Sequence, residues 1–263
     1  MIYASDLDRT LIFSERFINE NKVSKKNLTL VDECSLNSYI SNNVAKMISH
    51  IVSEGTVRFI PVTTRSTEQF KRIQFRKAGI PIEYAIVANG GVILHQGERL
   101  KDWEDYLNTQ MPDSDSFEAI ISAFNSIDSI DYKTKTVDER FIFTKCKDST
   151  DAKASVKIEV DEIKKDFPHF GFYMYNNKVY AIPKCFGKDI TLNWLKHRLN
   201  EDRILSSGDS SFDIPMLSTS DFRVVPDHCS IGSEDLRKLG VFVVNGGVES
   251  ALKTMAIVEN KSR

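Results

Sequence analysis

Short apolar runs alternate along this chain with longer segments in which apolar residues recur every three or four positions. Each run is bounded by polar residues and has the length of a buried strand rather than of a helix. Six runs share this character, and they span residues 2–5, 57–62, 84–88, 203–207, 222–225 and 241–244. We therefore expect strands at these places.

The segments between these runs have the periodicity of amphipathic helices. After the first run, Val44, Ile48 and Ile51 fall on one helical face, while Ser41 is placed to cap the helix and Gly55 to end it. Further helices are expected near residues 67–78, 188–199 and 248–257. Strands that alternate with helices form a parallel sheet covered on both faces, so the predicted fold class is α/β with a Rossmann-like parallel sheet.

The segment 99–183 breaks this alternation. It predicts a helix around residues 117–124, a strand at 140–145, a second helix at 156–167 and a hairpin that turns at Asn176 and Asn177. This mixture indicates an α+β domain inserted into the parallel-sheet domain. We therefore assign residues 1–98 and 184–263 to the core domain and residues 99–183 to the insert.

The two-residue turn of the hairpin fixes which side chains share a face. It sets Tyr175 opposite Lys178 and, further from the turn, Tyr173 opposite Tyr180. Strand alternation gives one apolar face, suited to packing on the insert helices, made of Phe172, Met174, Val179 and Ala181. The other face carries Tyr173, Tyr175, Lys178 and Tyr180.

Composition and charge narrow the classes of function. Hydrophobic residues make up 41% and charged residues 27%, which is typical of globular proteins. With a net charge of -2, no overall field draws the chain to nucleic acid or to a membrane surface. The few residues before Asp6 leave no room for a signal peptide, and the four cysteines lack the spacing of zinc or disulfide sites. We expect a cytoplasmic protein that acts on a small molecule.

Polar residues follow the predicted strands at the edge where open parallel sheets bind ligands. The first strand is followed by Asp6 and Asp8, the second by Thr63, Thr64 and Arg65, and the fourth by Asp209 and Asp213; Lys188 begins the helix before the fourth strand. Dense negative charge needs a hard cation, and Mg²⁺ fits best because it also polarises phosphate for attack. The predicted chemistry is phosphoryl transfer, in which one carboxylate can be the nucleophile and another can transfer protons.

These motifs resemble those of the haloacid dehalogenase (HAD) superfamily of phosphohydrolases. They are D-x-D-x-T, T-x-R after a strand, a lysine, and G-D-S-x-x-D-x-x-M-L, in that order. The resemblance implies that Asp6 is the nucleophile and Asp8 the general acid/base. It implies that Thr63 hydrogen-bonds the phosphoryl group and that Lys188 balances its charge. For Mg²⁺ it implies Asp6, the main-chain carbonyl of Asp8 and Asp209 as ligands, with Asp213 supporting the metal directly or through water.

The insert resembles the C2 cap of the sucrose-phosphatase-like and Cof-like branch of that superfamily. Asn89-Gly90-Gly91 resembles the N-G-A motif of this branch, which implies that Asn89 lies beside the substrate. Thr64 and Arg65 stand in its T-G-R motif and are further candidates for substrate binding. Because the open sheet face of a C2 cap looks onto the active site, Tyr173, Lys178 and Tyr180 are expected to help select the leaving group; a solvated face is the alternative.

Three residues depart from the family pattern: Arg9 replaces a glycine after the second aspartate, Asp189 the glycine after the lysine, and Phe212 the asparagine before the last aspartate. Arg9 either reaches toward the substrate or faces solvent or an ion-pair partner. Lys184 is an alternative to Lys188. The polar segment from Asn19 to Asn27 is expected to be a solvated loop, with a flap over the active site as the alternative.

We therefore expect a Mg²⁺-dependent phosphatase that hydrolyses a small phosphorylated metabolite, such as a sugar phosphate, through an aspartyl-phosphate. Two alternatives remain. A phosphomutase of the same fold would pass the phosphoryl group to a substrate hydroxyl instead of water. A ligand-binding protein would keep the fold without turnover. The joint retention of four residues argues against it: Asp6, Asp8, Lys188 and Asp209. The sequence leaves the oligomeric state open.

Overall fold

The computed structural model describes residues 1–34 and 37–262, which divide into two units. Unit 1 consists of Met1–Leu100 and Gly187–Arg263, and unit 2 of Lys101–Phe186. Unit 2 is therefore one continuous segment, whereas unit 1 is assembled from the two segments that flank it.

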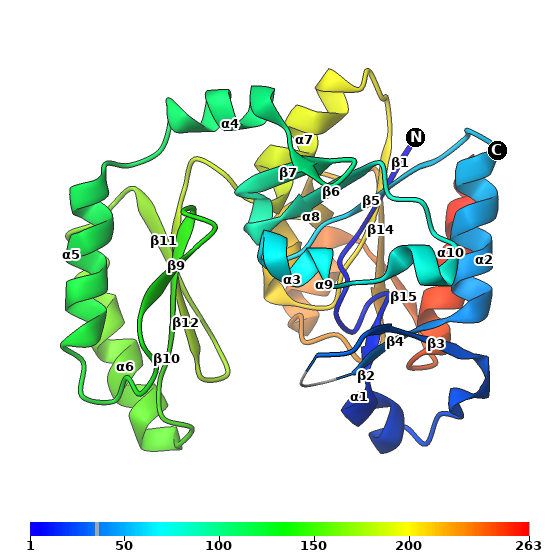
Figure 1. The fold of residues 1–263 in the computed structure, drawn as a ribbon. Coiled ribbons are helices and arrows are strands. Elements are labelled where there is room, and N and C mark those ends of the chain that lie inside the picture. Colours follow the sequence, from blue (N-terminus) through cyan, green and yellow to red (C-terminus); the bar gives the residue numbers. More distant parts are fainter. Residues whose placement is uncertain (35–36, 263) are drawn as a thin grey trace. The chain divides into compact units, whose positions relative to one another are not determined.

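Unit 1 is built on a five-stranded parallel sheet with the strand order β15-β14-β13-β1-β5 (Figure 1). The strands are β1 (Ile2–Ser5), β5 (Arg58–Pro61), β13 (Ile204–Ser207), β14 (Phe222–Pro226) and β15 (Phe242–Val244). All residues of β1 are buried, because this strand has neighbours on both edges and helices over both faces. Five of the expected strands are thus confirmed as one parallel sheet.

The sixth expected strand lies in a separate antiparallel sheet. It is β6 (Tyr84–Val87), which pairs with β7 (Val92–His95), and β7 pairs with β8 (Glu98–Arg99). A parallel bridge between Val62 and Ile86 connects β6 to the end of β5. The carboxyl end of β6 is thereby brought next to the carboxyl end of β5.

Helices cover both faces of the parallel sheet (Figure 1). On one side lie α2 (Asn42–Ser53) and α10 (Glu249–Ser262), and on the other α7 (Lys188–Arg198) and α8 (Ile214–Ser218). The apolar face predicted for α2 is buried, and Gly55 just after the helix has a positive φ of 72°. A further short helix, α9 (Ser233–Leu239), packs on α8. This doubly covered parallel sheet is the predicted α/β fold.

The helix expected at residues 67–78 is interrupted. Helix α3 covers Thr67–Lys71 and a 3-10 turn, η2, covers Phe75–Ala78. Between them the amide of Gln74 donates a hydrogen bond of 2.7 Å to the carbonyl oxygen of Val31, outside the helix. Since that amide bonds a neighbouring strand, the regular helical hydrogen bonds cannot continue through this position.

The segment before α2 contains more regular secondary structure than was predicted from its sequence. It forms an antiparallel sheet in the order β2-β4-β3 from β2 (Phe13–Ser14), β3 (Leu28–Asp32) and β4 (Ser38–Ser41). Between β2 and β3 lie helix α1 (Glu15–Glu20) and the 3-10 turn η1 (Lys25–Asn27). The prediction of a loop from Asn19 to Asn27 was therefore wrong at both ends, which belong to α1 and η1.

Unit 2 is a four-stranded antiparallel sheet with helices on one face. The strand order is β11-β12-β10-β9, formed by β9 (Lys135–Val137), β10 (Phe141–Lys145), β11 (Phe170–Tyr175) and β12 (Lys178–Pro183). Helices α5 (Ser114–Asn125) and α6 (Thr150–Ile163) pack on that face, and α4 (Lys101–Asn108) precedes them in the chain.

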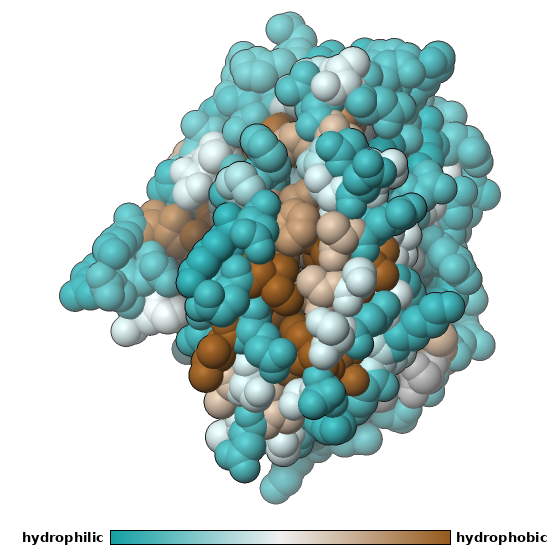
Figure 2. Space-filling view, turned by 90° about the vertical axis from the view of Figure 1, so that its left-hand side faces the viewer, coloured by the Kyte–Doolittle hydropathy of each residue, from teal (hydrophilic) through white to brown (hydrophobic). Residues whose placement is uncertain are grey.

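The pairing predicted for the hairpin of β11 and β12 is confirmed, including Tyr175 opposite Lys178 and Tyr173 opposite Tyr180. Its apolar face packs on α5 and α6 in one core, to which Val179 and Ala181 belong together with Phe124 and Val156. The outer side of these helices is mixed in character: Figure 2 shows apolar residues among polar ones, and Ile158 on α6 is 67% exposed.

Across residues 1–34 and 37–262, no helix is both long enough and apolar enough to pass through a lipid bilayer. All four cysteines are free thiols.

Candidate active site

Asp6 and Lys188 form a buried ion pair at the carboxyl end of β1. The Nζ atom of Lys188 lies 2.8 Å from Oδ1 of Asp6 and 2.6 Å from Oδ1 of Asp213, and it also donates to the carbonyl oxygen of Val62 at 3.2 Å. Lys188 is only 1% exposed. Burial lowers the pKa of this lysine, but Asp213 and Asp6 outweigh that effect and raise it overall. Lys188 is therefore a fixed positive charge beside Asp6.

The alternative lysine does not belong to this group. Lys184 follows β12 in unit 2, where its main-chain amide bonds the carbonyl oxygen of His169. Lys188 is the first residue of α7, and the pairing of β1 with β13 places the start of that helix and the end of β1 in the same unit. The structure thus brings Lys188 to Asp6.

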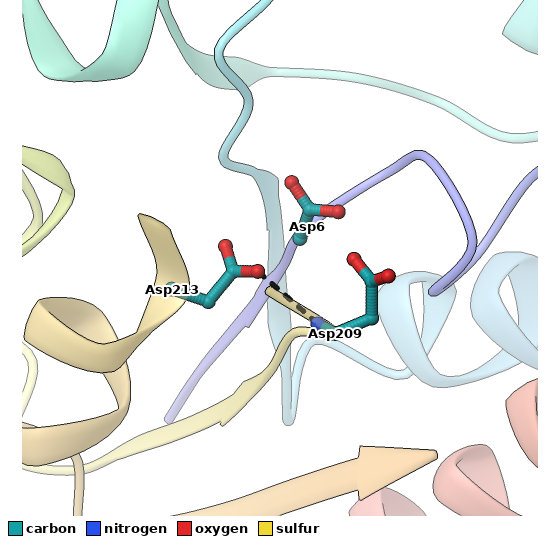
Figure 3. A group of neighbouring side chains, drawn as sticks. All are labelled: Asp6, Asp209 and Asp213. Atoms are coloured by element: carbon teal, nitrogen blue, oxygen red, sulfur yellow. Dashed lines mark hydrogen bonds between the residues drawn. The ribbon is translucent and has the colours of Figure 1, made fainter. Parts of the chain in front are cut away.

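Three buried carboxylates face one another at this edge of the sheet (Figure 3). Asp6 follows β1, Asp209 follows β13, and Asp213 ends the 3-10 turn η4 (Ser211–Asp213); each offers an oxygen within 4.8 Å of the others. The turn is tight, because a Cβ on Gly208 would lie 2.4 Å from Cβ of Asp213. Only glycine fits at position 208.

Crowding and burial raise the pKa values of two of these carboxyl groups, Asp6 and Asp209. Burial is the largest cause for Asp6, followed by the charge of Asp213, and together they hold its pKa well above the ordinary value. Burial and Asp213 also raise the pKa of Asp209, to about 7, against the opposing effect of Arg9. The site therefore carries negative charge that a cation would stabilise.

The hydrogen bonds show which oxygens are available to a cation. Asp213 is fully engaged: Oδ1 accepts from Lys188, and Oδ2 accepts from the amides of Asp209 and Ser210 and from the Ser210 hydroxyl, at 2.6–3.1 Å. Among the described residues, none donates a hydrogen bond to Oδ2 of Asp6 or to Oδ1 of Asp209. Carboxylate oxygens of this kind are the ligands that Mg²⁺ prefers. The site fits a divalent cation held by Asp6 and Asp209, with Asp213 fixing the loop.

The carboxylate of Asp8 is engaged elsewhere, by Arg65. Nε and Nη2 of Arg65 each lie 2.8 Å from an oxygen of Asp8, whose side chain is 52% exposed. The remaining Nη1 donates to Oδ2 of Asp32 at 2.7 Å. Burial lowers the pKa of Arg65, but Asp8 and Asp32 together raise it overall, so the guanidinium stays charged. Asp32 was not predicted from the sequence, because it ends β3, a strand that follows the predicted loop from Asn19 to Asn27 and was itself not predicted.

Thr63 and Asn89 lie beside each other at the ends of β5 and β6. The hydroxyl of Thr63 is buried and accepts from the amide of Arg65 at 3.1 Å, and Thr64 between them is partly exposed. The main-chain amide of Asn89 donates a hydrogen bond to the carbonyl oxygen of Thr63 at 3.0 Å. The side-chain oxygen of Asn89 is buried and accepts no hydrogen bond from any residue that the structure describes. It is available to a ligand.

Arg9 is ion-paired with the candidate metal ligand Asp209. Its backbone has a positive φ of 65°, the conformation that the glycine of the family pattern would adopt most easily. Nε lies 3.1 Å from Oδ2 of Asp209, Nη2 donates to the carbonyl oxygen of His228, and the guanidinium lies over the ring of Phe17. Of the two orientations that the sequence left open, the structure has the ion-paired one.

The hairpin residues expected to contact the leaving group lie on the sheet face of unit 2 opposite its helices. Tyr173 is 48% exposed, Lys178 is exposed, and Tyr180 is 8% exposed. The ring of Tyr180 packs at 5.3 Å from that of Phe143, and burial raises the pKa of its hydroxyl. Tyr173 and Lys178 thus match the solvated face that was the alternative, whereas Tyr180 is buried.

A model of the sucrose-6F-phosphate phosphohydrolase family matches residues 1–228 of the chain. The chain belongs to this family. It is accordingly a phosphoric monoester hydrolase of the HAD superfamily. No curated protein sequence matches this phosphohydrolase.

Several solved structures share the fold of this chain. A sucrose-phosphatase from Synechocystis sp. in complex with sucrose and phosphate has a TM-score of 0.68 at 16% identity, and the match covers 98% of each chain. A phosphatase of the haloalkanoate (HAD) superfamily from Bacteroides thetaiotaomicron has a TM-score of 0.60 at 12% identity, covering 100% of this phosphohydrolase and 95% of that chain. A sugar phosphatase of HAD subclass IIB has a TM-score of 0.58 at 12% identity, covering 100% and 99%.

Proposed function

We propose that this phosphohydrolase is a Mg²⁺-dependent phosphatase that hydrolyses a small sugar phosphate through an aspartyl-phosphate on Asp6. The observation that carries the proposal is the contact of Asp6 with Lys188, beside the buried carboxylate of Asp209. A carboxylate next to a fixed ammonium can approach a phosphate dianion, because the lysine offsets the repulsion between the two anions.

The first step forms a bond from an oxygen of Asp6 to phosphorus and breaks the bond from phosphorus to the ester oxygen. Asp8 supplies the proton that the departing alkoxide needs. In the second step Asp8 takes a proton from water as the water attacks phosphorus, and Asp6 leaves as a carboxylate. The half-exposed position of Asp8 supports this role, because its carboxyl group can reach solvent and substrate.

Asp6, the main-chain carbonyl of Asp8 and Asp209 would hold Mg²⁺, with Asp213 orienting Asp209 and Lys188 from behind. When bound, Mg²⁺ offsets the charge of the phosphoryl group and polarises it for attack. The hydroxyl of Thr63 would bind the phosphate, and the buried side-chain oxygen of Asn89 would bind the sugar.

The sugar is proposed from the family and from the neighbours, since one of them was solved with sucrose and phosphate. We propose that unit 2 serves as the cap and that Tyr173, Lys178 and Tyr180 contact the sugar. Aromatic rings stack on the apolar faces of sugars, and a lysine donates hydrogen bonds to their hydroxyls. Because the family is one of phosphohydrolases, water is the proposed acceptor.

The test is phosphate release from a panel of sugar phosphates with Mg²⁺, with an Asp6→Asn variant as the control. Phosphate release by the wild type but not by the variant supports the proposal. Transfer of the phosphoryl group between sugar hydroxyls without free phosphate would indicate a phosphomutase. Ligand-induced thermal stabilisation without any turnover would indicate a binding protein.

A further inference from the structure

Asp32 is a buried carboxylate at the end of β3, next to the site but outside the catalytic motifs. Both Val31 and Asp32 are buried, although consecutive residues of a regular strand point to opposite faces. The pairing of β3 with β4 shifts register between Leu30 and Asp32. An irregularity of this kind redirects a side chain, and here it accompanies a carboxylate turned inward.

The contacts of Asp32 lead to Arg65. Its Oδ2 accepts from Nη1 of Arg65 at 2.7 Å, and its Oδ1 accepts from the amide of Cys34 at 3.3 Å. Within the part of the chain that the structure describes, Arg65 is the one cation within ion-pair distance of Asp32. A buried carboxylate costs free energy unless a charged partner compensates it. Separating Arg65 from Asp32 would leave the Asp32 carboxylate buried without such a partner, so the ion pair is expected to persist.

Arg65 is held from three directions, and its fork points at Asp8. Its amide donates to the hydroxyl of Thr63, and its carbonyl oxygen accepts from the amide of Ala88 at 2.7 Å. Asp32 holds one terminal nitrogen, which leaves Nε and Nη2 as a flat pair of donors directed at both oxygens of Asp8. A long arginine side chain fixed at both ends presents this fork in one orientation.

We propose that Asp32 is a positioning residue that acts on Asp8 through Arg65. This inference about Asp32 rests on the proposed role of Asp8 in proton transfer. Asp8 must release an oxygen from Arg65 to reach a leaving group, and Arg65 then needs another anionic partner to stay in place. Asp32 is that partner. Each time Asp8 returns, the same fork receives it, so the carboxyl group keeps its orientation through both proton transfers.

A purely structural role of Asp32, tying β3 to the loop after β5, would have different consequences. It would lower stability and affect kcat whether or not Asp8 is present. A positioning role requires Asp8, so the two effects are not additive. The pair of variants Asp32→Asn and Asp8→Asn, alone and combined, separates the two readings.

The experiment measures kcat and KM for the best sugar phosphate together with thermal unfolding. The amide in Asp32→Asn keeps the size of the side chain, and we expect kcat to fall by about 10- to 100-fold with KM changed by less than about threefold. In the Asp8→Asn background the same substitution should change kcat by less than about threefold. Glu33→Gln is the matched control, because Glu33 is the next residue, is exposed and pairs with Lys77; it should behave as wild type.

Wild-type kcat in Asp32→Asn, or a full further loss in the Asp8→Asn background, would overturn the proposal. If Asp32→Asn does not fold, Arg65→Lys tests the same contacts, since it keeps a charge beside Asp32 but loses the fork. Folded Arg65→Lys with a kcat loss supports the proposal, and wild-type kcat contradicts it. If Asp8→Asn itself keeps wild-type kcat, the proposed function fails at its acid/base and the role of Asp32 falls with it.

Discussion

The two carboxylate oxygens of Asp6 have different surroundings. One oxygen is bonded to Lys188, and the other accepts no hydrogen bond from the described residues, which leaves it for a cation or a phosphorus atom. We expect Asp6→Asn to lower single-turnover phosphate release by a factor on the order of 10⁴ or more, because an amide is a poor nucleophile. Thermal unfolding close to that of wild type would show an intact fold. Activity within a few-fold of wild type would contradict covalent catalysis.

Arg9 forms an ion pair with Asp209, the carboxylate that is proposed to bind Mg²⁺. Its guanidinium is 3.1 Å from Oδ2 of that residue, so an incoming Mg²⁺ meets a positive charge that is already in place. We expect Arg9→Gln to tighten Mg²⁺ binding by about tenfold in calorimetric titrations without substrate, which corresponds to ~1.4 kcal/mol. Arg16→Gln, on the exposed face of α1, is the control. Weaker binding in Arg9→Gln would mean that Arg9 orders Asp209 for the metal instead.

The raised pKa of Asp209 predicts a pH dependence for Mg²⁺ binding at the proposed site. In the folded, metal-free protein this pKa is about 7 against an ordinary 3.8, so ionisation is disfavoured by folding. The stability linked to this group is fully present below pH 3.8 and is lost as the pH rises through about 7. Mg²⁺ binds the ionised form, so its affinity should rise with pH up to about 7 and then level off.

Calorimetry in buffers of different ionisation enthalpy measures the protons released when Mg²⁺ binds. We expect release at pH 6 and little at pH 9, and a larger Mg²⁺-induced rise in Tm at pH 8 than at pH 6. Equal affinity at pH 6 and pH 8 without proton release would contradict the prediction.

The turn between β6 and β7 depends on close packing against α7. Gly90 has a φ of 100°, and a Cβ there would lie 2.5 Å from the carbonyl oxygen of Gly187, the residue before Lys188. Gly97 has a similar φ of 89° but no atom within 4 Å of a Cβ. We expect Gly90→Ala to lower the free energy of unfolding by more than Gly97→Ala, for which backbone strain alone costs about 1–3 kcal/mol. Urea unfolding measures both, and equal losses would remove the packing argument.

The hairpin of β11 and β12 is proposed to select the leaving group. We expect Lys178→Ala to lower kcat/KM for the best sugar phosphate while changing that for p-nitrophenyl phosphate little, because the small ester has no sugar to recognise. Tyr180→Phe is the milder companion, since alanine at this buried position would leave a cavity. Equal losses on both esters, or none, would remove the hairpin from substrate selection.

The sequence predicted the elements whose apolar pattern follows from burial. It missed those that depend on hydrogen bonds or pairing with distant parts of the chain. The central strands β1 and β13 are buried at every residue, so their sequences are short apolar runs, and the hairpin register followed from its two-residue turn. The sheet of β2, β3 and β4 has short, partly polar strands, so its sequence resembles loop. The break after α3 depends on a hydrogen bond from Gln74 to β3, which no local pattern reveals.

In the candidate active site, too, some features were predicted from the sequence and others required the structure. Asp6, Lys188, Asp209 and Asp213 stand at strand and helix ends, so the sequence predicted that they converge, and the structure gathers them. That Asp8 pairs with Arg65, and that Asp32 completes this pair, depends on side-chain geometry across two sheets. Arg9 was recognised as a departure from the family pattern, but its partner required the structure.

At the scale of the whole molecule, unit 2 is continuous in the chain and unit 1 is not. The central strand β1 pairs on one edge with β5 and on the other with β13, whose residues Ile204–Ser207 come near the end of the chain. Asp6 thus belongs to the first residues of the protein and its partners Lys188 and Asp209 to the last third.

This arrangement has a consequence for synthesis on the ribosome. At roughly 5–20 residues per second, about 10–40 s pass between the emergence of β1 and that of β13. During this time β1 can pair with β5, but its other edge remains open, and an apolar strand with an open edge is a template for aggregation. Unit 2 emerges whole in the interval and has an apolar core of its own, whereas the parallel sheet of unit 1 cannot be completed until β13 has emerged. Chains that stop before residue 204 would carry the nucleophile on an unfinished sheet.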